Sequence, residues 1–188
     1  MVDVIWGDER TKSFVTNVGL VTSNGRLGHD VMSAEWTHML SYSPFMVSVS
    51  IRKGKTSHEN ISKSKQFGVS IASDKQDVLA SVAGSYSGKD VDKISLLKEL
   101  GFDFYKGKKI NALLVKGASM NAEFKLVKKI EAGSHTLFIG ECVELTALPI
   151  EPLAYHKGQF WELDKNVPKP NDAKRHEIKL LAEKHKRK

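Results

Sequence analysis

The amino-acid sequence predicts a mainly β fold, an antiparallel barrel that is closed or partly closed and carries helices at its periphery. Three observations support this prediction. Many short segments alternate between apolar and polar residues with the two-residue period of a strand, turn signals separate them, and few segments show helical spacing. Numerous short strands joined by long excursions are typical of antiparallel barrels.

The clearest strand pattern is that of residues 45–51, where four apolar residues alternate with Met46, Ser48 and Ser50. A first strand is expected to end at Asn24-Gly25, because both residues tolerate the left-handed backbone of a tight turn. The strands predicted on these grounds span 15–22, 45–51, 67–71, 122–126, 135–145 and, as a late hairpin turning at Lys157-Gly158, 153–161.

Helical signals are fewer. Thr56 and Glu59 have the spacing of a capping box, in which the threonine caps the helix and the glutamate reaches back, so a helix is expected through about Ser64. Further helices are predicted over 74–83, over 91–100 with Gly101 at its end, and over 172–186 after Pro168 and Pro170.

The chain of 188 residues suits one domain, which we place at 1–165, followed by a basic helical tail at 166–188. The net charge is +7, of which residues 173–188 carry +5 and the rest +2. Because a groove that binds nucleic acid places its charge on the fold, a nucleic-acid-binding barrel is only a remote alternative, resting on the tail.

Other features narrow the class of protein. No apolar run reaches the ~18 residues of a membrane span, and the N-terminus lacks the apolar core of a signal peptide, so we expect a cytoplasmic protein. The single cysteine, Cys142, cannot form an internal disulfide. The histidines show no metal-ligand spacing, so no metal site is predicted.

A candidate phosphate site follows the strand at 45–51. The run Arg52-Lys53-Gly54-Lys55 leads directly into the helix at Thr56, so three cations and a helix start lie close together. Its Gly-Lys-Thr ending resembles a nucleotide P-loop, but the upstream glycine of that motif would fall at Val49. The alternative is a basic turn before a capped helix with no ligand.

Two further segments are candidates. Met32 to Trp36 places small and polar residues beside a tryptophan, although a lone tryptophan is more often a core residue than the wall of a ligand site. The turn after it returns the chain to the strand with Ser48 and Ser50, so both segments would frame one pocket. His156 stands at the tip of the late hairpin, where a surface histidine without a role is the alternative.

Eight segments, taken in their order along the chain, carry a resemblance to a known family. They are 17–22, 32–36, Leu40-Ser41 with Pro44, 48–51, Thr56 with Asn60-Ile61, 85–90, 133–141 and 153–158. Together they resemble the flavin reductase-like FMN-binding split barrels. No one of these motifs is very specific, but their order and spacing are, and the likeness covers about residues 10–162. One departure is Gly133-Ser134-His135, where many relatives have Gly-Asp-His.

The resemblance implies a Greek-key split barrel of six strands that forms a homodimer, with FMN near the subunit interface. It implies that Ser33, Ala34, Glu35 and Trp36 line the isoalloxazine, and that His156 lies near the nicotinamide. It also implies that Ser48, Ser50 and Ile51 contact the ring edge and the ribityl chain, and that Arg52, Lys53, Thr56, Asn60 and Lys89 hold the phosphate.

The function implied is an FMN-dependent oxidoreductase, in which hydride passes from NAD(P)H to FMN and electrons then pass to an acceptor. That acceptor would be free flavin, a ferric chelate or a partner protein. The alternative is an electron-transfer protein that binds FMN but does not use NAD(P)H.

Overall fold

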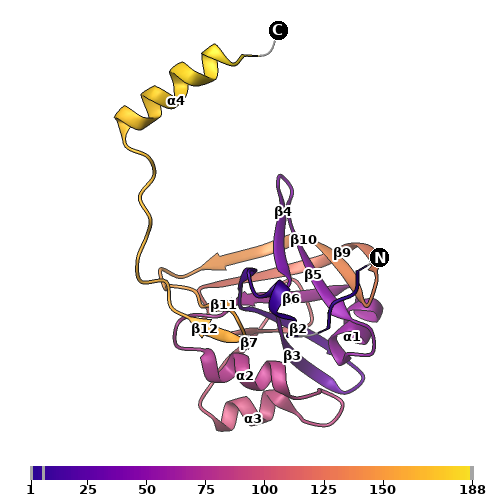
Figure 1. Cartoon of the computed structure of the whole chain (residues 1–188). Helices are drawn as coiled ribbons and strands as arrows, with labels where there is room; N and C mark the ends of the chain where they lie inside the picture. Colours follow the sequence, from indigo (N-terminus) through magenta and orange to yellow (C-terminus); the bar gives the residue numbers. More distant parts are fainter. Residues whose placement is uncertain (1, 6, 187–188) are drawn as a thin grey trace.

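The structure is a computed structural model that describes residues 2–5 and 7–186, and strands dominate its body (Figure 1). The predicted mainly β class is therefore confirmed. The strands span Val15–Asn17 (β1), Gly19–Gly25 (β2), Gly28–Ala34 (β3), Thr37–Tyr42 (β4), Phe45–Arg52 (β5), Gln66–Ile71 (β6), Phe104–Lys106 (β7), Leu113–Val115 (β8), Met120–Ala132 (β9), His135–Ala147 (β10), Ala154–His156 (β11) and Gln159–Trp161 (β12).

One antiparallel sheet makes up most of the body, with its strands in the order β3-β2-β6-β9-β10-β5-β4. Its two edge strands, β3 and β4, are separated along the chain only by Glu35 and Trp36. They form one nearly continuous run of chain that bends at these residues and supplies both edges of this sheet of seven strands. The Ser50 amide donates to the Trp36 carbonyl at 3.0 Å and joins the bend to β5.

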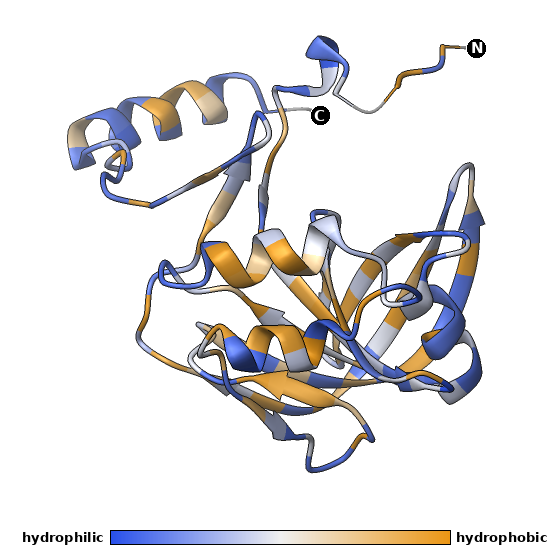
Figure 2. Cartoon of the chain, turned by 90° about the horizontal axis from the view of Figure 1, so that it is seen from below, coloured by the Kyte–Doolittle hydropathy of each residue, from blue (hydrophilic) through white to orange (hydrophobic). Residues whose placement is uncertain are grey.

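Two apolar clusters are buried in the body. One fills the barrel, where the rings of Phe67 and Phe124 stack with centroids 5.3 Å apart beside the fully buried Phe138. The other lies under the helices that follow β6 and includes Leu79 and Leu97. Figure 2 shows apolar residues concentrated in the body, whereas they alternate with hydrophilic ones along the C-terminal helix.

The predicted helices are present, with shifted ends. The second starts three residues later than its prediction, and the third is shorter but ends next to Gly101, whose φ is +89°. The helices span Glu9–Thr11 (η1, a 3-10 turn), Thr56–Ser64 (α1), Asp77–Ser85 (α2), Lys93–Glu99 (α3) and Asp172–Lys184 (α4).

The first hairpin turns two residues later than predicted. Gly25 is still a strand residue, and the turn runs through Arg26 and Leu27 to Gly28, which has φ +90°. Gly25 is needed for space: a Cβ there would lie 1.9 Å from Oδ1 of Asn60. The prediction of the Asn24-Gly25 turn was therefore wrong, because a packing requirement resembled a turn signal. The late hairpin turns at Lys157-Gly158 as predicted, with φ of +52° and +76°.

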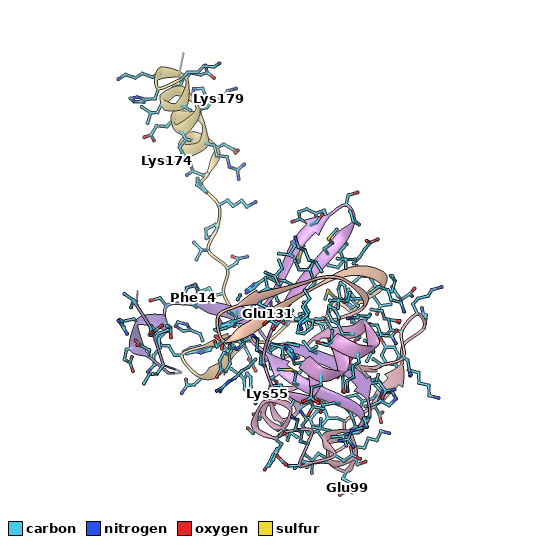
Figure 3. All side chains as sticks on the ribbon, turned by 90° about the vertical axis from the view of Figure 1, so that its right-hand side faces the viewer. Phe14, Lys55, Glu99, Glu131, Lys174 and Lys179 are labelled. Carbon is cyan, nitrogen blue, oxygen red and sulfur yellow. The ribbon has the colours of Figure 1, made fainter. Side chains whose placement is uncertain are left out.

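The tail lies apart from the body. Helix α4 has no buried residue, and Lys174 and Lys179 on it lie far from the barrel (Figure 3). A chain segment with Pro168 and Pro170 connects the helix to β12 (Figure 1). Among the described residues, no helix is both long and apolar enough to cross a membrane.

Candidate functional site

The bend between β3 and β4 and the strand β5 lie side by side, as the sequence predicted. The hydrogen bond from Ser50 to Trp36 holds them together. Ser48 and Ile51 are buried, and Ile51 points into the barrel cluster, so only its backbone is available to a ligand. Trp36 is 46% exposed, and its ring lies 4.7 Å from that of His135.

Ser33 and Ala34 are the last two residues of β3, just before the bend. Ala34 is buried in the barrel cluster. The Ser33 hydroxyl donates to the Ala80 carbonyl at 2.6 Å and so ties β3 to α2. Ser33 also lines a cavity, which makes it the point where the bend and the cavity meet.

This cavity of about 100 Å³ lies at the N-terminus of α1. Its walls are β3, residues 55–57 at the start of α1, the end of α2 with the loop at 86–88, and Lys93 of α3. Pockets for whole drug-sized ligands hold roughly 300–1,000 Å³, so this cavity suits the terminal group of a ligand rather than the whole molecule.

Thr56 is the most informative residue of this cavity. The residue is only 7% exposed, and its Oγ1 has no hydrogen-bond partner among the described residues. The predicted capping box is wrong: the N-cap is Lys55, which makes no side-chain cap, and Glu59 pairs instead with Lys89 at 2.8 Å. The amides that a cap would satisfy at the start of α1 therefore have no side-chain partner from the cap.

The next residues of α1 fasten the helix in place. Ser57 donates to Asp30 at 2.9 Å, and Asn60 donates to the Ser23 hydroxyl at 3.2 Å. His58 Nε2 lies 3.0 Å from the Thr136 hydroxyl. Three side chains thus bond to three different strands and fix the helix start beside the cavity.

The predicted phosphate cations divide into two groups. Lys53 pairs with Glu131 at 2.5 Å, and Lys89 pairs with Glu59, so both are engaged with carboxylates. Arg52 is exposed at the end of β5. Lys55 belongs to the same basic run but was not predicted as a phosphate ligand, and it lines the cavity.

Sequence reasoning missed a buried ion pair behind the cavity. Lys93 Nζ lies 3.0 Å from Asp30 Oδ1, and both side chains are almost inaccessible to solvent. The two residues are 63 positions apart, and only the packing of α3 on β3 brings them together. Each belongs to an unremarkable polar segment, so the sequence carried no signal for the pair.

His156 lies at the end of β11, which pairs with β1. Its Nδ1 is 3.1 Å from the Phe14 carbonyl. The preceding Tyr155 pairs with Thr16 of β1, and Asn17 of that strand donates to the Thr37 carbonyl beside the bend at 2.7 Å. Burial and then the charge of Glu35 raise the pKa of the Tyr155 hydroxyl. Burial raises the pKa of Glu35 itself. The hairpin with His156 therefore approaches the bend through Tyr155.

Comparison with known proteins identifies the family. The family model "Flavin reductase like domain" matches residues 11–164. An NADH-dependent FAD reductase of Streptomyces globisporus is 27% identical over 149 residues, covering 78% of this chain and 79% of that protein. A ferric-chelate reductase (NAD(P)H) of Archaeoglobus fulgidus is 28% identical over 126 residues, covering 67% and 71%.

An uncharacterised protein of Pyrococcus abyssi is 32% identical over 117 residues, or 62% of this chain, and the chain spans 65% of its length. Among solved structures, flavoredoxin of Desulfovibrio vulgaris (Miyazaki F) superposes with a TM-score of 0.76 at 25% identity, covering 93% of this chain and all of that one.

An FMN-binding protein of Thermus thermophilus gives a TM-score of 0.78 at 22% identity, with 90% of this chain and 97% of that one covered. These likenesses confirm the predicted split-barrel fold. The family model covers most of the chain, and the two relatives whose names state an activity are the FAD reductase and the ferric-chelate reductase. This chain belongs to the flavin reductase-like family, whose members are flavin-binding oxidoreductases.

Proposed function

We propose that this protein binds FMN, oxidises NAD(P)H with it and passes the electrons to an acceptor. The observation that carries the proposal is the buried hydroxyl of Thr56, which has no partner and lines the cavity at the start of α1. A buried hydroxyl without a partner costs free energy, and a phosphate oxygen would satisfy it.

The cavity has the chemistry of a phosphate site. The N-terminus of α1 supplies unpaired amides and the positive end of the helix dipole, and Lys55 supplies a charge. We assign phosphate binding to Thr56 and Lys55, with Arg52 nearby on the same run. Lys53, Asn60 and Lys89 would act indirectly, because their partners Glu131, Ser23 and Glu59 hold the surrounding loop and helix.

The flavin ring would lie outside the cavity, which is too small for it, along the bend and β5. Ser33, Ala34, Glu35 and Trp36 would border the ring, and Ser48, Ser50 and the backbone of Ile51 would face its edge and the ribityl chain. When bound, FMN supplies the capacity to accept hydride from a nicotinamide and to release electrons one or two at a time.

His156 would help to orient the nicotinamide on the outer side of the ring. Its ring is held by the Phe14 carbonyl, and its backbone carbonyl accepts a hydrogen bond from Trp161 Nε1 at 3.0 Å. These hydrogen bonds fix the imidazole at the end of β11, so it can orient a polar group of the nicotinamide. No side chain of the chain is required as a nucleophile.

We also propose that the protein is a homodimer through β4. Tyr42 is 86% exposed, and Met39 and Leu40 on the same strand are about half exposed. β4 continues directly from the bend at Trp36, so a second copy seated on this strand would also cover the flavin ring. Light scattering should give twice the chain mass of 20.9 kDa, and a monomer at micromolar concentration would contradict the dimer.

Anaerobic mixing with NADH and with NADPH tests the reductase function. Loss of the oxidised flavin absorption band with either nucleotide supports it, and adding FAD, FMN or a ferric chelate to the reduced protein then identifies the acceptor. The second candidate is an electron carrier, favoured by the likeness to flavoredoxin. That candidate predicts no loss of the band with either nucleotide but full reduction by dithionite.

A further inference from the structure

A buried ion pair lies directly behind the cavity at the start of α1. Lys93 Nζ is 3.0 Å from Asp30 Oδ1, and the side chains are 2% and 6% exposed. Ser57 donates to the second carboxylate oxygen at 2.9 Å. The loop backbone packs on the same carboxylate, since a Cβ on Gly88 would lie 2.5 Å from Oδ1. The pair therefore joins β3, α1, α3 and the loop between α2 and α3.

Folding stability is not a sufficient reason for this pair. Removing two charges from water is unfavourable, so a buried pair is often no more stabilising than apolar residues of similar volume. Asp30, Ser57 and Lys93 all line the cavity. The charges of Asp30 and Lys93 therefore act directly on any ligand bound in the cavity.

Two lysines share the cavity wall. Burial lowers the pKa of Lys93, Asp30 raises it, and the positive charge of Lys55 lowers it again. Lys55 and Lys93 thus lie close enough to repel one another, with Asp30 as the one carboxylate among the cavity-lining residues that the structure describes. An anion in the cavity would relieve that repulsion.

We propose that Lys93 is a second cation of the phosphate site and that Asp30 restrains its charge. Asp30 neutralises Lys93 in the absence of ligand and shares it with the phosphate when FMN binds. Without Lys93, the Asp30 carboxylate would face the phosphate uncompensated and repel it. This inference rests on the proposed function, since it assigns a residue to the same site.

The test compares FMN with riboflavin, which has the same ring and no phosphate, by quenching of flavin fluorescence. Lys93→Met should weaken FMN binding about tenfold or more, as expected for a charge-assisted contact, and change riboflavin binding less than about twofold. Asp30→Asn should tighten FMN binding, because it releases the charge of Lys93 to the phosphate, although it leaves a buried lysine unpaired and lowers the thermal midpoint.

Opposite effects on affinity separate this proposal from a purely structural role. Equal weakening of both flavins by Lys93→Met would overturn it, and so would an Asp30→Asn variant that folds but binds FMN no more tightly than wild type. If Asp30→Asn does not fold, the double variant Asp30→Asn/Lys93→Met tests the role of Asp30 instead. It removes both charges and should bind FMN with an affinity between wild type and Lys93→Met, whereas equality with Lys93→Met would overturn the role of Asp30.

Lys116→Met is the matched control, because Lys116 pairs with Asp103 at 3.2 Å on the surface, where both side chains are about 70% exposed. It should change neither affinity. Failure of the proposed function can be distinguished from failure of this inference, because the wild-type protein would then bind neither flavin. Wild type that prefers FMN, with variants that do not follow the pattern above, would refute this inference alone.

Discussion

Thr56 occupies the first position of α1 with its hydroxyl buried and without a partner. Desolvating a hydroxyl without a hydrogen bond costs about 1–3 kcal/mol. The sequence predicted this residue as a phosphate ligand and also offered a capping box as the alternative. In the structure Lys55 is the N-cap, so the Thr56 hydroxyl is not used for capping, and its role as a phosphate ligand stays a prediction.

Thr56→Val keeps the shape and removes the hydroxyl. We expect the free energy of unfolding without flavin to stay the same or to rise by up to about 1–3 kcal/mol, and FMN affinity to fall about tenfold or more. Urea unfolding and flavin titration measure the two effects.

Thr22→Val is the control, because Thr22 is also fully buried with an unpartnered hydroxyl but does not line the cavity. It should give a similar change in stability without loss of affinity. A Thr56→Val variant that binds FMN as well as wild type would exclude Thr56 as a phosphate ligand.

His58 links the first turn of α1 to Thr136. Burial, followed by the charge of Lys129, lowers the pKa of its imidazole. The unfolded chain therefore binds the proton more readily, so stability is complete above the unfolded value of about 6.5 and falls as the pH drops from there towards the lower folded value.

His58→Gln should flatten this loss of stability below about pH 6.5 without abolishing it, because burial also lowers the pKa of His29 and His135. Urea unfolding at several pH values measures the slope. His176→Gln on the exposed α4 is the control. An unchanged slope in His58→Gln would show that His58 does not contribute.

At the scale of elements, β10 connects the core to the site, since it pairs with both β9 and β5. The register shifts between Ile139 and Gly140, where two aromatic rings pack on the strand. A Cβ at Gly140 would lie 2.6 Å from Phe67 Cζ and 2.7 Å from Phe124 Cβ. Glycine is required here for space.

Gly140→Ala should lower the free energy of unfolding by about 1–3 kcal/mol, the usual cost of overpacking a core. Thermal or urea unfolding measures it. The neighbouring Glu141 is exposed, so Glu141→Ala should change stability by less than about 0.5 kcal/mol. Equal stability of Gly140→Ala and wild type would mean that the rings can move apart.

Elements with clean alternation could be predicted, and those without it could not. The strand at 45–51 and the hairpin at 153–161 were predicted almost to the residue. β9 runs to Ala132, six residues past its prediction, because its last part is exposed and has no apolar face. The bend at Glu35 and Trp36 carries no glycine or proline, so no local signal marks it as the point where one strand changes edges.

The candidate site was predictable only where its residues are neighbours in sequence. Ser33, Thr56 and Lys55 of the basic run, which line the cavity, lie in short segments that the sequence singled out, and their role as ligands stays a prediction. The ion pair of Asp30 with Lys93 depends on tertiary packing, and periodicity carries no information about it.

At the scale of the whole molecule, the tail differs from the barrel in its charge and packs little against it. α4 makes no buried contact, and much of the net charge lies in residues 173–188. The boundary at 165 and 166 between a flavin-binding domain and a tail stays a prediction, as does the remote alternative of nucleic-acid binding through the tail.

Deleting residues 166–188 should leave both the thermal midpoint and FMN affinity unchanged, because the deletion exposes no core. Calorimetry and flavin titration test this. A lower midpoint would show that the tail packs on a barrel, in the same chain or in a second copy. Salt-dependent DNA binding by the full chain that disappears on deletion would support the nucleic-acid alternative.

The central claim is that the start of α1 is the phosphate end of an FMN site. Parallel titration of the wild-type chain with FMN and riboflavin, followed by fluorescence, tests it most directly. The account predicts one FMN per chain, bound about tenfold or more tighter than riboflavin. Equal affinity for the two flavins, or no binding of either, would contradict it.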